Sequence, residues 1–332
     1  SIGEQILPLA RVVPRIGLWA TPEPHEDGDI KLHSFVSMSH FASILVQTLE
    51  AEHIPFKWFY GHVETEEFQR PFGITVRALT AVKNMDKARI GWFGGLAPGF
   101  INMQFDTERM RQKLGVDVVA HELSDLIQRA KGYDSEVVAQ TVREIYAAAR
   151  SVRVSESAAF DRVTRLYLAL SDTAREQGYD ALAVSCWSEF QEAYRIAPCM
   201  AYSWMGSEDG IAVSCEGDVY GAISMYLLNL LSGAHGSSTL LDMAVIDTVD
   251  PAALMWHCGV SPRHFANQAG IQWVDHVTLG RKSTNVYGVA GDQVFAANPA
   301  TISYLSRSGD ILLVVGAAIV ERENPGYAGT RG

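Results

Sequence analysis

The sequence predicts an α/β fold in which Rossmann-like parallel-sheet domains are followed by an antiparallel, β-barrel-like C-terminal domain. Two patterns indicate this fold. Up to about residue 234, short apolar runs alternate with segments of helical spacing, as in βαβ units. After about Thr239, short alternating runs are separated by turn residues, with no convincing helix. At 332 residues the chain exceeds the roughly 250 to 300 residues at which single cores stop growing, so we expect several domains.

The first expected domain, residues 1–84, is part of an α/β domain. The run RIGLWATPEP, which begins at Arg15, predicts a buried strand followed by a loop that contains prolines. Residues 34–52 then have helical spacing. In α/β proteins, polar side chains that follow such a strand often lie at a binding or catalytic site.

The second expected domain, residues 85–234, repeats the order of strand and helix. Strands are predicted in ARIGWFGG, in VDVVAHEL, in residues 179–186 and in IAVSC, and helices in residues 106–114, 135–177 and 221–232. Strands joined through helices run parallel, which implies a parallel sheet. The third expected domain, residues 235–332, holds the runs AVIDTV, QWVDHVTL and DILLVVGAAIVERE.

Composition narrows the class of protein. Hydrophobic residues make up 48% and charged residues 20% of the chain, as in a globular protein. The formal net charge of −11 disfavours nucleic acid and membrane partners, which need a concentrated positive face. No apolar run approaches the roughly 20 residues of a membrane span and no leader is seen, so a cytoplasmic location is expected. The four cysteines lack CxxC spacing and are expected to be free, mostly buried thiols.

A glycine-rich segment, GWFGGLAPGF at residues 91–100, lies between a predicted strand and a predicted helix. Such a loop can cradle phosphate, but this one lacks the GxGxxG and GxxxxGKS orders. A plain strand-to-helix turn is the favoured interpretation, and no nucleotide site is predicted.

The segment CEGDVYG places Glu216 and Asp218 between the predicted strand IAVSC and an apolar helix. Substrates of α/β proteins lie beside such sheet edges. The alternative role is a helix cap, because acids satisfy the free N–H groups of a helix start. We favour the cap for Asp218 and leave both roles open for Glu216.

Two further polar residues emerge from apolar stretches. Asp242 follows Leu240 and Leu241, and His257 lies in WHCG after another apolar run. Acids and histidines in this setting are typical of a metal ligand sphere. His257 could instead be a hydrogen-bonded core residue. Cys258 beside it could suggest a Cys–His nucleophile, although members of such pairs normally come from distant segments.

Candidate sugar-binding residues follow the strand that ends near residue 186. Trp187 and Glu189, in CWSEF, supply the aromatic ring and the acid that sugar sites use, with a packed tryptophan and a solvated glutamate as the alternative. An anionic group of a sugar could be bound by an arginine, and the candidates are Arg195, Arg263 and Arg281. The alternative is that they are ordinary arginines on the surface.

These segments together resemble the L-fucose/L-arabinose isomerase superfamily, especially its fucose isomerase-like proteins. The carriers, in order, are LWATPEP, ARIGWFGGLAPGF with the following FD and LGVDVV, DALAVSCWSEF, CEGDVYGAISMYLLNLLSG, Asp242 and WHCG. The resemblance runs from about residue 15 to the end of the sequence.

The resemblance implies a metal site. Glu216 and Asp242, 26 residues apart (242 − 216), match the acids that bind a divalent metal in this family, usually Mn²⁺. His257 resembles the histidine ligand that arabinose isomerases place shortly after the second acid. Members of this family normally have a tail after the segment GTRG that supplies another metal-binding histidine, and this sequence does not include it. The resemblance also implies a homo-oligomer, a trimer or hexamer, in which neighbouring subunits complete the sites.

The implied function is a metal-dependent aldose–ketose isomerase acting on an unphosphorylated sugar through an enediolate. A divalent cation that chelates O1 and O2 stabilises the charge formed when the C2 hydrogen leaves. Glu216 and Asp242 would hold the metal and shuttle the proton, and Trp187, Glu189 and Arg263 would bind the sugar. The family includes converters of fucose, arabinose and sulfoquinovose-type sugars, and the sequence does not choose among them.

Two alternative functions stay open at this point. A non-catalytic sugar- or partner-binding homologue would keep the pocket and lose turnover. A Cys–His hydrolase using Cys258 or Cys186 is disfavoured, because no glycine-framed nucleophile motif surrounds either cysteine.

Overall fold

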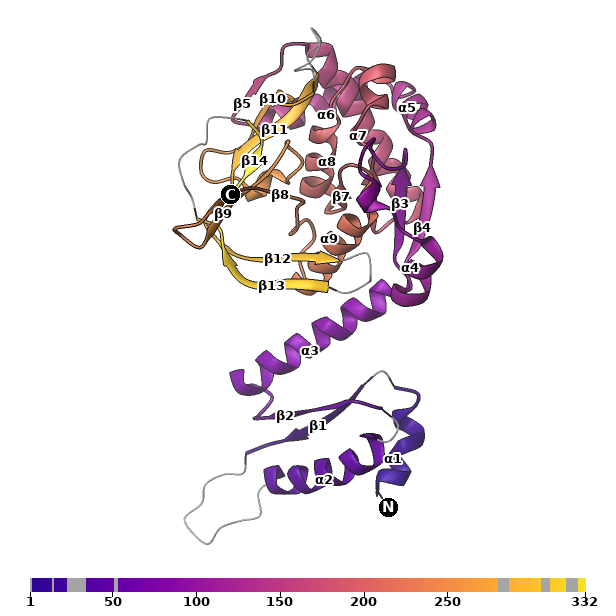
Figure 1. Cartoon of the computed structure of the whole chain (residues 1–332), viewed down its shortest axis with the longest axis vertical. Helices are drawn as coiled ribbons and strands as arrows, with labels where there is room; N and C mark the ends of the chain where they lie inside the picture. Colours follow the sequence, from indigo (N-terminus) through magenta and orange to yellow (C-terminus); the bar gives the residue numbers. More distant parts are fainter. Residues whose placement is uncertain are drawn as a thin grey trace. The chain divides into compact units, whose positions relative to one another are not determined.

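The computed structural model describes residues 2–13, 15–22, 34–50, 53–279, 287–305, 311–320 and 328–332. The chain divides into two compact units, Ser1–Lys83 and Asn84–Gly332 (Figure 1). No helix in these ranges is both long and apolar enough to cross a lipid bilayer.

The first unit is a small βαβ arrangement. It contains α1 (Ile2–Ala10), β1 (Ile16–Ala20), α2 (Ser34–Leu49), β2 (Phe56–Tyr60) and most of α3 (Glu66–Met85). β1 and β2 pair in parallel, and Ala10, Leu45 and Leu49 form the centre of its small core. The predicted strand and helix are therefore present, but the strand is only partly buried, with Ala20 as its one buried residue. Most of the predicted proline loop lies outside the described residues.

The second unit begins with a four-stranded parallel sheet. Its strands are β3 (Arg89–Phe93), β4 (Asp117–His121), β6 (Ala181–Val184) and β7 (Ala212–Ser214), in the order β4-β3-β6-β7. The predicted parallel sheet is confirmed. Because all four strands run the same way, the residues that follow them meet at one edge.

Helices cover both faces of this sheet. Side chains of α5 (Leu123–Lys131), α7 (Ser157–Gln177) and α8 (Cys199–Trp204) belong to one core, and those of α4 (Thr107–Leu114) and α9 (Val219–Ser232) to the other. Short turns of helix occupy Ile101–Met103, Phe190–Tyr194 and Met205–Asp209. Each core includes side chains of the sheet, which is thus buried on both sides, as parallel sheets usually are.

One predicted helix is wrong. Residues 135–177 form two helices, α6 (Ser135–Ala147) and α7, separated by the strand β5 (Ser151–Arg153). The break depends on a distant segment, because β5 pairs in parallel with β10 and the backbone N–H of Arg150 donates to the carbonyl of Ile271 at 2.8 Å. A tertiary pairing overrides the local helical spacing here.

The C-terminal strands form mixed sheets. A six-stranded sheet has the order β5-β10-β11-β14-β9-β8 and includes β8 (Asp242–Asp247), β9 (Ala252–His257), β10 (Gln272–Asp275), β11 (Gly288–Val294) and β14 (Thr330–Arg331). Three of its five pairings are antiparallel and two are parallel, so the sheet is not the purely antiparallel one that the alternating runs predict. Its first strand, β5, comes from the segment between α6 and α7.

A separate hairpin, β12 (Pro299–Leu305) and β13 (Ile311–Ala318), packs beside α9 (Figure 1). The backbone N–H of Leu305 donates to the hydroxyl of Ser224 in α9 at 3.0 Å. Past α9, the described residues contain only the short 3₁₀ turn Arg263–Phe265 as helix, in agreement with the predicted β-rich character.

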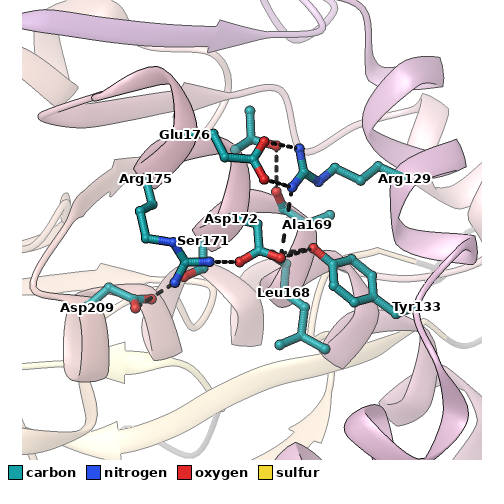
Figure 2. A network of polar contacts seen from close by, with 10 residues as sticks. Arg129, Tyr133, Leu168, Ala169, Ser171, Asp172, Arg175, Glu176 and Asp209 are labelled. Atoms are coloured by element: carbon teal, nitrogen blue, oxygen red, sulfur yellow. Dashed lines mark hydrogen bonds and ion pairs between the residues drawn. The ribbon is translucent and has the colours of Figure 1, made fainter.

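A polar network joins α5 and the turn after it to α7 (Figure 2). Arg129 donates two hydrogen bonds to Glu176, at 2.7 and 2.6 Å, and also lies near Asp172. Asp172 accepts a hydrogen bond from the hydroxyl of Tyr133 at 2.5 Å and pairs with Arg175. Burial, followed by the contact with Asp172, raises the pKa of Tyr133 to about 12, so the hydroxyl stays a donor.

Candidate metal centre

The backbone around Glu216 forms a tight turn between β7 and α9. Glu216 and Gly217 have φ values of 57° and 72°, in the left-handed region. That conformation costs a non-glycine residue roughly 1 to 3 kcal/mol and persists only where the surroundings fix it. Here the carbonyl of Glu216 accepts from the N–H of Ala97 at 2.9 Å, and the N–H of Gly217 donates to Val184 at 3.1 Å.

The glycine-rich loop after β3 packs against this turn. The indole N–H of Trp92 donates to the carbonyl of Gly217 at 3.1 Å. A Cβ on Gly217 would lie 2.0 Å from the carbonyl oxygen of Gly95, so no larger residue fits there. The loop thus holds the backbone that carries Glu216, which is a structural role for the GWFGG segment.

The carboxylate of Glu216 meets the ring of His257. The two side chains are 12% and 3% exposed, and Nε2 of His257 lies 3.7 Å from Oε2 of Glu216. Glu216 follows β7, whereas His257 ends β9 in the mixed sheet. Two of the residues predicted as metal ligands are therefore brought together from different sheets.

Each group of this pair also contacts a thiol. Cys186 donates to Oε1 of Glu216 with a sulfur-to-oxygen distance of 3.9 Å, and Cys258 Sγ lies 3.3 Å from Nδ1 of His257. Burial alone would lower the pKa of His257, but the contacts with Cys258 and Glu216 outweigh it and the net shift is upward. Hydrogen bonds from Cys199 and Cys215, together with the adjacent His257, lower the pKa of Cys258.

The donor set fits a divalent cation. A carboxylate oxygen and an imidazole nitrogen both bind first-row divalent metals. Two donors each about 2.1 Å from one ion lie about 3.0 Å apart at a right angle and farther apart at wider angles. The 3.7 Å separation is too long for a good hydrogen bond and within the range of two ligands of a shared ion.

Asp242 stands apart from this pair. It is the first residue of β8, an edge strand, and its side chain is exposed. It pairs with Trp256, so strand alternation directs it to the opposite face of the β8–β9 pair from His257. No group of close potential metal ligands in the described part of the chain includes Asp242. Its role as a ligand stays a prediction.

The predicted sugar-binding residues lie in different settings. Trp187 and Glu189 are both exposed just after β6, and the ring of Phe100 lies 6.0 Å from that of Trp187. Arg263 binds Glu208 at 2.8 Å and lies over the ring of Trp204, so its guanidinium already has partners. These roles stay predictions, and Arg281 lies outside the described residues.

Asp218 occupies the N-cap position of α9 without a side-chain capping hydrogen bond. Burial raises the pKa of its carboxyl, while the backbone N–H groups of Gly221 and Tyr220 act in the opposite direction. Asp218 thus stands at the predicted place, but its Oδ1 is buried without a hydrogen-bond partner.

The spacing of the cysteines in the sequence did not predict that they lie close together. All four are free, as predicted, but they also occur in overlapping sets of potential ligands, three of them with Glu216 or His257 and Cys199 with Cys258 and His276. A signal was present in the sequence, because Cys186 precedes Trp187, Cys215 precedes Glu216 and Cys258 follows His257. Three of the four thus adjoin predicted site residues.

The chain is similar to curated proteins named sulfoquinovose isomerase. It is 27% identical over 254 residues to that of Alkalicoccus urumqiensis, covering 76% of this chain and 55% of the relative. It is 25% identical over 323 residues to those of Priestia aryabhattai and Priestia megaterium, covering 94% of this chain and 68% of each relative. No family model matches the chain. The matches thus span about half to two thirds of these relatives and most of this chain.

Proposed function

We propose that this chain acts in a metal-dependent aldose–ketose isomerase that converts an unphosphorylated sugar. The observation that carries the proposal is the buried pair of Glu216 and His257, with 3.7 Å between carboxylate and imidazole, at the ends of two strands. The similarity to proteins named sulfoquinovose isomerase supports the same reaction class and makes that sugar a candidate substrate. We assign Glu216 and His257 as ligands of Mn²⁺ or another divalent cation.

Each residue of the proposed site would have its own role in the reaction. A divalent cation, when bound, would polarise the sugar oxygens at C1 and C2 and so acidify the C2 hydrogen. Glu216, held rigidly by its turn and shielded from water, would fix the position of the reacting carbons. The second carboxylate, which we assign to Asp242, would move a proton between C2 and C1. Trp187 would stack on the sugar, and Glu189 would bind its hydroxyl groups.

A homo-oligomer, a trimer or hexamer, is part of the proposal. Met243, Val245 and Ile246 on the edge strand β8 are 58%, 54% and 64% exposed. Exposed apolar edge strands tend to pair with another chain. A neighbouring copy on this strand would cover the apolar side chains and would change the surroundings of Asp242.

The finer architecture is also proposed. We propose a β-rich third domain at residues 235–332, after α/β domains at 1–84 and 85–234. The strands β8 to β14 support it, while β5 from the proposed second domain joins its six-stranded sheet, and residues 84–332 form one compact unit. We propose that this third domain is barrel-like, as the resemblance implies.

A non-catalytic sugar- or partner-binding homologue is the second candidate. The observation that favours it is the exposed Asp242, which the described structure does not group with Glu216 and His257. Such a protein would bind a sugar at the buried pair without moving a proton.

Proton exchange separates the two candidates. The protein with Mn²⁺ is incubated in D₂O with sulfoquinovose, L-fucose, L-arabinose and D-arabinose, and NMR follows deuterium at C2 and the appearance of ketose. We expect exchange with at least one sugar, abolished by a chelator and restored by Mn²⁺. Sugar binding without exchange in any case would favour the binding homologue. Neither exchange nor a rise of the thermal midpoint with Mn²⁺ would count against the metal site.

A further inference from the structure

The ring of His257 lies between two chemically different sets of groups. Its Nε2 faces the carboxylate of Glu216 at 3.7 Å, and its Nδ1 lies 3.3 Å from the sulfur of Cys258. Cys215, His257 and Cys258 each offer a ligand atom, and these atoms all lie within 4.8 Å of one another. The soft sulfur of Cys258 therefore lies beside one nitrogen of the ring and a hard carboxylate lies beside the other.

We propose that Cys215, Cys258 and Nδ1 of His257 form a binding site for a thiophilic cation such as Zn²⁺ or Cd²⁺. Cys199 lies beside this set, with its sulfur 3.9 Å from that of Cys258, but belongs to a different group of potential ligands. In a tetrahedral zinc site with Zn–S near 2.3 Å and Zn–N near 2.0 Å, sulfurs lie about 3.8 Å apart and sulfur and nitrogen about 3.5 Å. The 3.3 Å between Sγ of Cys258 and Nδ1 of His257 is within a few tenths of an ångström of the second value, and the sulfurs of Cys215 and Cys258 lie within 4.8 Å of each other.

The carboxylate of Glu216 completes this arrangement. A histidine that binds a metal through one nitrogen usually donates its other N–H to a carboxylate, which fixes the ring and its tautomer. With Nδ1 on the cation, Nε2 of His257 carries the proton and faces Glu216. Closing the 3.7 Å gap by less than an ångström would give that hydrogen bond.

The other nearby sets are less suitable. Cys199 and Cys258 also lie near His276, but Nδ1 of that ring accepts from the backbone N–H of Leu279 at 3.0 Å. The remaining nitrogen of neutral His276 therefore carries a hydrogen and has no lone pair to offer. The set of Cys186, Cys215 and Glu216 holds one hard carboxylate and no imidazole, which suits a soft cation less well.

Access and proton balance are consistent with binding. Cys258 is the partly exposed member of the set, whereas Cys199 and Cys215 are buried. Each thiol that becomes a ligand gives up one proton to solvent, and no oxidant or reductant is needed.

One consequence rests on the proposed function. The isomerase metal would need the lone pair of Nε2 on His257, whereas a thiophilic cation on Nδ1 leaves the ring proton on Nε2. The same imidazole cannot serve both cations in its neutral form. We therefore expect Zn²⁺ or Cd²⁺ to displace Mn²⁺ and to inhibit isomerisation.

Cadmium titration tests the thiol site without any reference to activity. Reduced, metal-free protein is titrated with Cd²⁺, and the ultraviolet charge-transfer absorption of cadmium thiolates is followed. We expect saturation at a one-to-one ratio. Cys215→Ser and Cys258→Ser should each weaken cadmium binding by at least about tenfold. Loss of a residue that only supports a metal ligand already lowers metal affinity by about 10- to 100-fold, and loss of a ligand should do no less.

Cys186→Ser is the matched control, because this buried cysteine lies beside Glu216 but outside the set formed with His257. It should keep the full cadmium absorption, and circular dichroism verifies that every variant is folded. Absence of thiolate absorption in the wild type would overturn the proposal, as would equal affinity in all three variants. Cadmium binding without any Mn²⁺-dependent exchange would instead sink the isomerase proposal and leave the thiol site standing.

Discussion

Glu216 and Asp242 have the same predicted role but lie in opposite environments. Glu216 follows a strand of the parallel sheet, accepts a hydrogen bond from the glycine-rich loop through its carbonyl, and is buried. Asp242 begins an edge strand of the mixed sheet and is exposed. Both follow apolar residues in the sequence, but the run before Glu216 is buried, whereas Leu240 and Leu241 before Asp242 are only partly buried. An acid next to an apolar run is buried only where other elements cover that run.

The difference has an electrostatic consequence. Charges interact several-fold more strongly in a protein interior than in water, where solvent and salt screen them. Removing the charge of Glu216 should therefore affect metal binding and catalysis together. Removing that of Asp242 should affect proton transfer more than metal affinity.

The largest expected effect comes from amides at these two positions. Glu216→Gln should abolish both Mn²⁺ binding and C2 exchange, because a buried amide is a weak ligand and the exchange depends on the bound metal. Asp242→Asn should lower exchange by about 100-fold or more, as loss of a general base does, with a smaller effect on Mn²⁺ affinity. Calorimetric titration gives the affinity, and NMR in D₂O gives the exchange.

Asp250→Asn is the control for the second variant, since it removes the same charge from an exposed position in the turn between β8 and β9. Exchange should be unchanged in it. Exchange that survives in Asp242→Asn would remove this residue from the mechanism, and equal loss of Mn²⁺ in both amide variants would place the two acids in one ligand sphere.

The next effect concerns the turn that carries Glu216. Gly217→Ala meets both a left-handed backbone, with φ of 72°, and the carbonyl of Gly95 at 2.0 Å. Gly233→Ala meets the same backbone, with φ of 73°, but open space. A side chain in the left-handed backbone lowers the free energy of unfolding by about 1 to 2 kcal/mol, which applies to both variants. The overpacking against Gly95 lowers it by about 1 to 3 kcal/mol more, in Gly217→Ala alone.

Gly217→Ala should therefore unfold at clearly lower denaturant than Gly233→Ala and should also bind Mn²⁺ more weakly. Chemical denaturation of both variants measures the difference in the free energy of unfolding. Equal stability would show that the turn can relax away from Gly95, and the rigid positioning of Glu216 would then be wrong.

Much of the fold was predictable from local patterns. The apolar runs gave the parallel strands β3, β4, β6 and β7, because strands buried on both faces read as continuous apolar segments. The break between α6 and α7 was not predictable, because β5 exists only through its pairing with β10, over a hundred residues later. The mixed direction of the C-terminal sheet depends in the same way on distant partners.

The site was predictable in part. Glu216 and His257 could be named from strand ends and from the resemblance, but their 3.7 Å contact joins two sheets and has no local signal. The exposure of Asp242 depends on the edge position of β8, which no alternation pattern specifies. The convergence of the cysteines was likewise invisible to a search for CxxC spacing.

A smaller effect should appear at Asp218, next to the buried site. Burial raises the pKa of its carboxyl above the ordinary 3.8, so the folded state holds the proton more tightly than the unfolded state. The free energy of unfolding is therefore not reduced at pH values below the pKa that Asp218 has in the unfolded state. It falls as the pH rises through the pKa that Asp218 has in the folded state. Asp218→Asn removes this loss and keeps a good N-cap residue.

In chelated protein, the thermal midpoint of Asp218→Asn should exceed that of the wild type at neutral pH, and the difference should vanish in acid. Thermal unfolding across the pH range measures it. A difference that stays constant with pH would mean that packing, and not ionisation, distinguishes the two side chains.

The smallest effect is expected where charges are exposed, as in the network between α5 and α7 (Figure 2). Arg129 contacts Glu176 at 2.6 Å and Asp172 at 3.8 Å, but its side chain is 34% exposed and that of Glu176 is 52% exposed. Solvent screens such pairs, and many contribute little to stability. We expect Arg129→Gln to lower the thermal midpoint by only about 2 °C, because large domains shift little for a small change in free energy.

Arg111→Gln is the matched control, since Arg111 pairs with Glu108 within α4 at 2.8 Å, with side chains 65% and 55% exposed. Its midpoint should move less than that of Arg129→Gln, because the Arg129 network links two helices and the Arg111 pair lies within one. Both shifts should shrink in high salt. A large, salt-independent loss in Arg129→Gln would show that this network is shielded from solvent like the pair of Glu216 and His257, and exposure would then not explain the contrast between buried and surface charges in this protein.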